Sequence, residues 1–238
     1  MDAIRWNKET RQAYVGTLLY SLLGILASIL TPIAAAGSLM SAVGGSSGGG
    51  FLGVLLIIVQ LCVIAGYVMF FLAVKDLKEI TEGEDQVAFK KVYLSIIFSV
   101  LASVFSIFHV PFVPGICSIV ACILLILGYN ALKKSAAIAA FSPVAAKGFK
   151  RLFTAEILII IGVVIGWIPL IGGVIGAIIS VIAWVMILLG WKAVATPVVV
   201  EGMAPEAEKP ITQVIAETVS ESIEEIKEEV KEEIKEKE

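Results

Sequence analysis

The chain has 238 residues, of which 58% are apolar and 16% charged, and its mean hydropathy is +0.97. Soluble domains are about 45–50% apolar and about 25% charged, and a soluble core of this size could not bury so many long apolar runs. Several runs approach or exceed the roughly 20 residues that cross a hydrocarbon layer about 30 Å thick. The composition therefore excludes an ordinary soluble domain and predicts an integral membrane protein.

The net charge of −3 is divided unevenly along the chain. Residues 1–200 carry 13 Lys or Arg and 8 Asp or Glu, whereas residues 201–238 carry 5 Lys and 13 Glu. The sequence thus predicts a mildly basic membrane body followed by an acidic tail.

Six apolar helices are expected after a polar N-terminus at residues 1–12. They cover roughly residues 13–37, 51–74, 92–110, 115–132, 152–168 and 170–191. The first could instead belong to a cleavable signal peptide, but its apolar stretch is longer than the 7–15 residues typical of such peptides. A retained first helix is the favoured interpretation.

Basic residues alternate between the connections of this six-span arrangement. The N-terminus has three, the loop 75–91 four, the loop 133–151 five, and Lys192 follows the sixth helix, while the intervening connectors around 37–50, 109–114 and 168–173 have none. Cytoplasmic loops carry the excess of Lys and Arg. The pattern predicts a multi-pass protein of the cell membrane with both termini in the cytoplasm.

The same pattern of residues recurs along the membrane body. Residues 89–93 (FKKVY) match 149–153 (FKRLF), Pro111 and Gly115 match Pro169 and Gly173, and residues 129–132 match 191–194. A looser copy opens the chain, where residues 11–14 lead to Pro32 and residues 71–74 close the unit. We therefore expect three tandem helical hairpins, at 13–74, 92–132 and 152–194. All three enter and leave on one side, unlike the inverted repeats of many transporters.

The third hairpin combines a basic-aromatic start, an Ile-Pro-x-x-Gly-Gly turn at residues 168–173 and a Leu-Gly-aromatic-Lys end at residues 189–192. This combination resembles an uncharacterised family of small prokaryotic polytopic membrane proteins, a domain of unknown function, over roughly residues 85–195. The resemblance implies the same membrane hairpins. It implies no activity and no site residues.

Small residues recur at four-residue spacing in the last two helices, where they would let membrane helices pack backbone to backbone. We expect them to hold the last hairpin closed or to join it to a neighbour, the alternative being chance in a glycine-rich chain. These helix-packing candidates are Gly162, Gly166, Gly172, Gly176 and Ser180.

Hydroxyl groups follow one face of the first and third helices, and Gln60 is the strongly polar neutral residue in mid-span. They could line a polar path or bond between helices. The candidates for such a path are Ser21, Ser95, Ser99 and Gln60. Glu156 is the one ionisable residue within a predicted span, and a structural pairing with Lys150 or Arg151 is the favoured interpretation.

Motifs of catalysis and metal binding are missing from the sequence. His109 is the only histidine, and Cys62, Cys117 and Cys122 lie in apolar runs without a C-x-x-C spacing. Neither a G-x-S-x-G nor an H-E-x-x-H motif occurs. The sequence therefore predicts a protein that is not an enzyme, with no catalytic residues, no metal site and no cofactor.

The C-terminal segment divides into a Pro/Glu-containing linker at residues 195–210 and an acidic tail at 211–238. Apolar residues of the tail follow a helical spacing with an eleven-residue recurrence, which is typical of a right-handed coiled coil. The tail could bind a cytoplasmic protein or a second copy of the chain, or remain a solvated amphipathic helix. The negative charge of the tail argues against its binding anionic lipid or nucleic acid.

The fold class expected from the sequence is an all-α transmembrane protein, a six-helix bundle of three hairpins with an acidic amphipathic C-terminal helix. The expected function is a non-enzymatic structural or accessory scaffold in the lipid bilayer, with a tail that binds a cytoplasmic partner. The alternative is a small transporter or channel with a hydroxyl-lined path.

Overall fold

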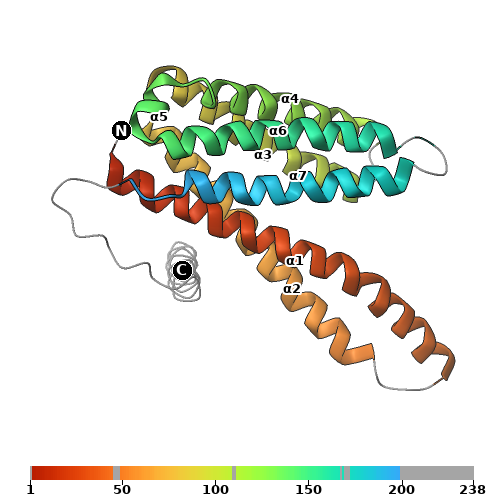
Figure 1. Ribbon diagram of the computed structural model, residues 1–238. Coiled ribbons are helices and arrows are strands. Elements are labelled where there is room, and N and C mark those ends of the chain that lie inside the picture. The colour runs from red at the N-terminus through yellow and green to blue at the C-terminus, as the bar shows by residue number, and fades with distance from the viewer. Residues whose placement is uncertain (1, 45–48, 109–110, 167, 169–171, 199–238) are drawn as a thin grey trace, which may run out of the picture. The chain divides into compact units, whose positions relative to one another are not determined.

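Seven α-helices and no strand make up the part of the chain that the structure describes, which is residues 2–44, 49–108, 111–166, 168 and 172–198 of a computed structural model (Figure 1). The all-helical class predicted from the sequence is confirmed for these residues. In chain order the helices are α1 (Ala3–Gly44), α2 (Gly49–Ile80), α3 (Gly83–Ile107), α4 (Val113–Leu132), α5 (Ala136–Phe141), α6 (Pro143–Gly166) and α7 (Gly172–Val194).

Four of the described helices contain segments that are long and apolar enough to cross a membrane. These are Ile57–Ile80, Gly83–Phe105, Val113–Leu132 and Gly172–Val194. They support the membrane class predicted from the composition. The predicted linker at 195–210 is described only as far as residue 198, and the predicted tail at 211–238 lies outside the described residues, as does His109.

The helices extend well beyond the apolar runs. α1 begins at Ala3 rather than near residue 13, and Asp2 Oδ1 caps it by accepting a hydrogen bond from the Ile4 N–H (2.9 Å). The segment 75–91, expected to be a polar loop, is helical except at residues 81–82. Lys, Glu and Gln are good helix formers, so charge alone does not end a helix. The break falls at Gly83, whose φ of 61° lies in the left-handed region that glycine adopts without steric penalty.

The expected polar loop at 133–151 is also largely helical and contains the short helix α5. Ser135 Oγ caps α5 by accepting a hydrogen bond from the Ile138 N–H (3.0 Å). Ser142 Oγ in turn accepts a hydrogen bond from the Ala145 N–H (3.2 Å). Pro143 takes the first position of α6, where a backbone N–H would have no partner within the helix, so its absence costs no hydrogen bond. α6 therefore begins at Pro143 rather than near residue 152.

Consecutive long helices pack in pairs, and the pairs close into a ring. α1 packs along α2, α3 along α4, and α6 along α7; further contacts join α2 to α3, α4 to α6, and α7 back to α1. Figure 1 shows α6 and α7 running side by side. Each pair is antiparallel because a short connection joins helices that lie along one another. Six long helices thus surround a common interior.

A layer of aromatic rings fills this interior toward the polar ends of the helices. Each of the six long helices contributes one ring: Trp6, Phe70, Phe89, Tyr129, Phe149 and Trp191. Edge-to-face contacts link them, with centroids 5.2 Å apart between Phe70 and Trp191 and 5.9 Å apart between Phe89 and Phe149. This geometry is preferred between rings because their positive edges meet negative faces. The layer, which we call the aromatic layer, closes the interior at that end.

One close backbone approach recurs in the three helix pairs, and it shows how their sequences correspond. A Cβ added at Gly66, Gly128 or Gly190 would lie 3.0–3.2 Å from the carbonyl oxygen of Gly16, Ala88 or Gly148, respectively. Each of the three glycines precedes an aromatic residue, so Tyr67 corresponds to Tyr129. The repeat pattern read from the sequence matched Phe71 to Tyr129 instead. That alignment of the first hairpin is therefore displaced by four residues.

Candidate functional site

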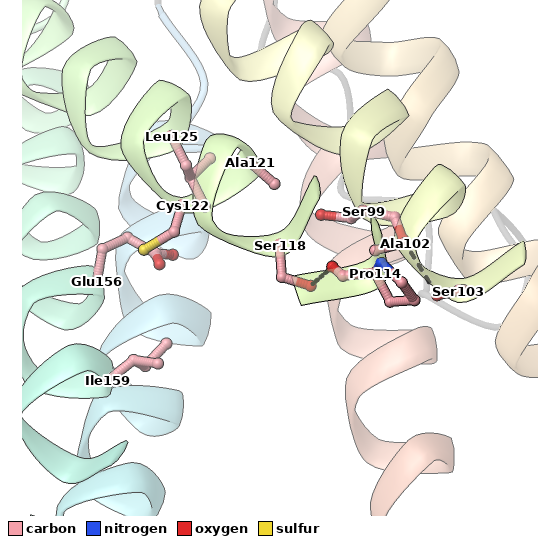
Figure 2. A pocket seen from close by; sticks show the side chains of 10 residues that line it. All are labelled: Ser99, Ala102, Ser103, Pro114, Ser118, Ala121, Cys122, Leu125, Glu156 and Ile159. Atoms are coloured by element: carbon pink, nitrogen blue, oxygen red, sulfur yellow. Dashed lines mark hydrogen bonds between the residues drawn. The ribbon is translucent and has the colours of Figure 1, made fainter. Parts of the chain in front are cut away.

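A pocket of about 480 Å³ opens between α3, α4 and α6 (Figure 2). Ser99, Ala102 and Ser103 line it from α3, a series from Pro114 to Leu125 lines it from α4, and Glu156 and Ile159 line it from α6. The volume falls within the range of small-molecule sites, roughly 300–1,000 Å³. This pocket is the candidate functional site.

Glu156 brings a carboxyl group to the wall of the pocket. Its residue is 8% exposed, and in Figure 2 the side chain extends toward Cys122 on α4. The expected pairing with Lys150 or Arg151 does not occur, because both basic residues lie exposed on other faces of α6. Lys8 and Glu9 form an ion pair (3.9 Å), far along the sequence from this site.

The hydroxyl groups of the pocket present oxygen lone pairs to its interior. Ser99 donates its proton to the Ser95 carbonyl (3.0 Å), Ser103 to the Ser99 carbonyl (3.1 Å) and Ser118 to the Pro114 carbonyl (2.9 Å). A serine hydroxyl has one proton to donate and two lone pairs to accept with. Because each of these serines donates its proton to a carbonyl of its own helix, its oxygen can only accept further hydrogen bonds. Together with Glu156, the polar lining is suited to a ligand that donates hydrogen bonds or carries positive charge.

Two tyrosines lie near Glu156, toward the aromatic layer. Tyr20 and Tyr129 lie within the electrostatic reach of the Glu156 carboxyl. Tyr129 packs on Trp191 with ring centroids 6.5 Å apart, and Tyr20 packs on Tyr67 at 5.8 Å. At the other end Pro114 and Ser118 stand in the first turns of α4, next to the connection between α3 and α4. Glu156 therefore lies between that connection and the aromatic layer.

The structure does not bring the predicted polar path together. Ser99 lines the pocket, and Ser95 is buried one turn below it, where its Oγ donates to the Val92 carbonyl (2.6 Å). Ser21 is buried on α1, and Gln60 is exposed on α2; neither lines the pocket. The sequence reasoning missed Ser118 and Cys122, whose four-residue spacing on α4 was a usable signal.

The predicted helix-packing residues lie along the contact between α6 and α7. A Cβ at Gly176 would stand 2.6 Å from the Gly162 carbonyl oxygen and 3.1 Å from Gly166 Cα, and one at Gly162 would stand 3.1 Å from Ser180 Oγ. A Cβ at Gly172 would meet the Ile165 carbonyl oxygen at the start of α7. Gly162, Gly176 and Ser180 thus allow the two helices to approach within one hairpin, whereas a Cβ at Gly166 would meet nothing within 4 Å.

The described residues hold no group of three or more His, Cys, Asp or Glu that could bind a metal ion. Of the cysteines, Cys62 is exposed, Cys117 buried and Cys122 half-buried at the pocket. No family model, no curated protein and no solved structure matches this chain. The fold itself defines the class: an all-helical protein with four described helices apolar enough to cross a membrane.

Proposed function

We propose that this is a six-span membrane protein with both termini in the cytoplasm, and that it binds a small positively charged solute in the pocket between α3, α4 and α6. It would act as a small transporter or channel rather than as an enzyme. The observation that carries the proposal is the Glu156 carboxyl, placed in a pocket whose other polar groups are hydrogen-bond acceptors.

The packing of α1 and α6 supports six spans rather than four. α1 packs along α2, and α6 packs along α7, and both α2 and α7 contain segments able to cross a membrane. A helix that accompanies a spanning helix along its length shares its depth in the bilayer. The backbone bonds of a helix are satisfied internally, as a membrane requires. Three hairpins, each entering and leaving the membrane on the side of the basic residues, would account for the pairing of α1 with α2 and for that of α6 with α7.

The case for a cationic solute is electrostatic. A carboxyl group held away from water keeps a proton unless a positive charge or several donors compensate its negative charge, so a cation can bind there in exchange for that proton. The pocket provides neither, since its lining contains no Lys, Arg or His and its serines donate to their own helices. A small cation would compensate the negative charge of Glu156 and would be coordinated by the serine lone pairs.

The scaffold function expected from the sequence has less support from the described residues. Its partner-binding tail at 211–238 lies outside them. The glycine stripe that could have joined two copies of the chain is occupied by the α6–α7 contact. Binding of a cytoplasmic protein by the tail remains compatible with the solute-binding function, because the two use different parts of the chain.

Charged thiol reagents at Cys122 test the proposal directly. With Cys62 and Cys117 replaced by Ala, the reaction rates of a cationic methanethiosulfonate (ethylammonium) and an anionic one (ethylsulfonate) are compared. The carboxyl of Glu156 should make the cationic reagent react faster. Glu156→Gln should remove that preference without closing the pocket.

A variant whose only cysteine replaces Gln86, which is exposed near the start of α3 and outside the pocket, provides the matched control. Its preference between the two reagents should not respond to Glu156→Gln. Uptake of methylammonium into proteoliposomes should fall with the same substitution. If Cys122 reacts with neither reagent, water-soluble solutes do not reach the pocket and the proposal is wrong.

A further inference from the structure

The segment that joins α4 to α6 has an unusual charge composition. Residues 133–151 carry five Lys or Arg and no Asp or Glu, whereas residues 75–91 carry four Lys and five Asp or Glu. The positive-inside tendency explains an excess of basic residues on one side of a membrane. It does not explain why one connection has its charges compensated and the other does not.

Three lysines of this segment lie near one another, and one of them contacts an aromatic ring. Lys133 follows α4 directly, and its Nζ lies over the Phe153 ring of α6, 3.2 Å from the centroid. Lys150 precedes Phe153 by three residues on α6 and so lies on the same face of that helix. Lys134 is exposed beside Lys133. We call these three residues the lysine cluster.

The lysines of the cluster act on one another. Partial burial lowers the pKa of Lys133 below its ordinary value, and the positive charges of Lys134 and Lys150 lower it further. No carboxylate among the described residues opposes this effect on Lys133. Asp85 of α3 accepts a hydrogen bond from Ser135 Oγ (2.8 Å) in this segment, but it forms no ion pair with the three lysines. The cluster therefore has positive charge without an internal counter-ion.

The corresponding junction between α2 and α3 differs in this respect. There Lys78 lies over the Tyr93 ring, 4.8 Å from its centroid, and Tyr93 corresponds to Phe153 in the repeat. Asp76 and Glu79 flank Lys78 in the sequence. A lysine over an aromatic ring is thus a shared structural contact of the repeats. The missing acids are specific to the junction of α4 with α6.

An apolar stripe leads along α4 to the cluster. Ile116, Ile123 and Leu127 are exposed, and their spacing of seven and four residues places them on one face of the helix. Lys133 and Lys134 follow directly at the C-terminal end of α4. A molecule with a negatively charged head and an apolar chain would contact both the cluster and the stripe.

We propose that Lys133, Lys134 and Lys150 bind the phosphate of an anionic phospholipid headgroup, with an acyl chain lying on the exposed face of α4. Basic pockets between membrane helices on the cytoplasmic side are suited to such headgroups, and lysines act there as point charges toward phosphate. This site is separate from the pocket at Glu156 and does not depend on its function.

Lipid binding to the full-length protein in neutral detergent tests the proposal by native mass spectrometry. Wild-type protein should bind phosphatidylglycerol more tightly than phosphatidylcholine. Each lysine near a membrane surface contributes about five-fold in affinity, so changing all three lysines to Gln should weaken phosphatidylglycerol binding roughly 100-fold. The double variant K134Q/K150Q keeps the contact of Lys133 with Phe153 and should lose about 25-fold.

The repeat supplies the control, because the triple variant K75Q/K90Q/K91Q removes the same charge from the other connection. Its phosphatidylglycerol affinity should change far less.

Equal losses in both triple variants would show only general attraction to negative charge. Competition by inorganic phosphate as strong as by the lipid would assign the site to a free anion. A change in melting temperature of K134Q/K150Q without lipid would assign the cluster to a contact within the chain. Each of these results would overturn the proposal.

Discussion

Glu9 shows how burial sets the protonation of a single residue at the polar end of α1. It is 5% exposed, its Oε1 lies 3.9 Å from Lys8 Nζ, and its Oε2 has no hydrogen-bond partner. Burial raises the pKa of Glu9 above its ordinary value of 4.5, and the negative charge of Asp76 raises it further, against the opposing effects of Lys8 and Arg5. The protonated form of Glu9 is therefore favoured by the folded protein.

The fold should accordingly become less stable as Glu9 loses its proton. Because the pKa is higher in the folded than in the unfolded state, the stabilisation is complete below about pH 4.5 and disappears as the pH rises through the folded-state value. Glu9→Gln mimics the protonated form and should raise the free energy of unfolding at pH 7.5 by about 1 kcal/mol, with little effect at pH 4. Melting temperatures in detergent at the two pH values would measure this.

Glu79→Gln is the matched control, since Glu79 is exposed on α2. Surface substitutions of this kind change stability by less than about 0.5 kcal/mol. If Glu9→Gln gave the same change at both pH values, the protonation of Glu9 would not be the cause.

The sequence could place Glu156 within a span but could not name what it faces. Lys150 and Arg151 precede it closely enough to make a pairing plausible. The structure places Glu156 on the face of α6 toward α4, and the two basic residues on exposed faces. Whether a polar residue lines a pocket depends on how its helix is rotated against helices distant in the sequence, and local spacing does not fix that rotation.

At the scale of helices, glycine contacts decide how closely α1 and α2 approach. A Cβ at Gly16 would lie 2.7 Å from the Gly66 carbonyl oxygen and from the Phe70 backbone nitrogen, whereas one at Gly24 on the same helix would meet nothing within 4 Å. Atoms of the backbone cannot move aside as the end of a flexible side chain can. The two glycines of α1 thus differ in environment while sharing a helix.

Alanine at these two positions should have opposite effects on stability. Gly16→Ala forces α1 and α2 apart and should lower the free energy of unfolding by about 1–3 kcal/mol. Gly24→Ala should leave it unchanged or raise it by up to about 1 kcal/mol, because alanine favours a helix over glycine. Thermal unfolding of both variants in the same detergent makes the comparison. Equal destabilisation by both would contradict the close approach.

The apolar parts of the helices could be predicted from the sequence, but their ends could not. Apolar runs and the reversals near Pro111 and Pro169 have local causes. The continuation of α2 and α3 through the charged segment 75–91 could not be predicted from local sequence. Charged residues with high helix propensity occur in solvated helices as well as in loops. The Ser142–Pro143 start of α6 was a readable cap signal.

For the whole molecule, the ring of helices and its aromatic layer depend on contacts between distant segments. The ring centroids of Trp6 and Phe89 lie 6.3 Å apart, as do those of Phe149 and Trp191. The spacing of residues within one helix does not predict these pairs. The layer lies toward the basic ends of the helices, and Pro114 and Ser118 line the pocket toward the opposite ends. The direction of solute access therefore depends on the orientation of the chain in the membrane.

Charge distribution distinguishes six spans from four at this scale. If only the helices containing the four apolar segments crossed, α1 and α6 would remain on the side where they begin. Residues 1–12 and Lys192 would then lie on the opposite side from residues 75–91 and 133–151. The basic residues would be divided between the two faces, against the usual excess on the cytoplasmic side. Six spans instead place all 13 Lys and Arg of residues 1–200 on one face.

Labelling of single cysteines with a membrane-impermeant thiol reagent would decide between these arrangements. Exposed positions are available for the purpose at Gln86, Phe112, Ala137 and Ile168, in a background without the native cysteines. With six spans, intact cells should be labelled at 112 and 168, and at 86 and 137 only after permeabilisation. Four spans place residue 168 on the same side as residue 137 instead, because α6 would not cross.

Position 168 therefore discriminates between the two arrangements. Positions 86 and 112 lie on opposite sides in either arrangement and serve as internal controls. Labelling of 168 together with 137 would refute the six-span arrangement and, with it, an outward-facing pocket lined by α6.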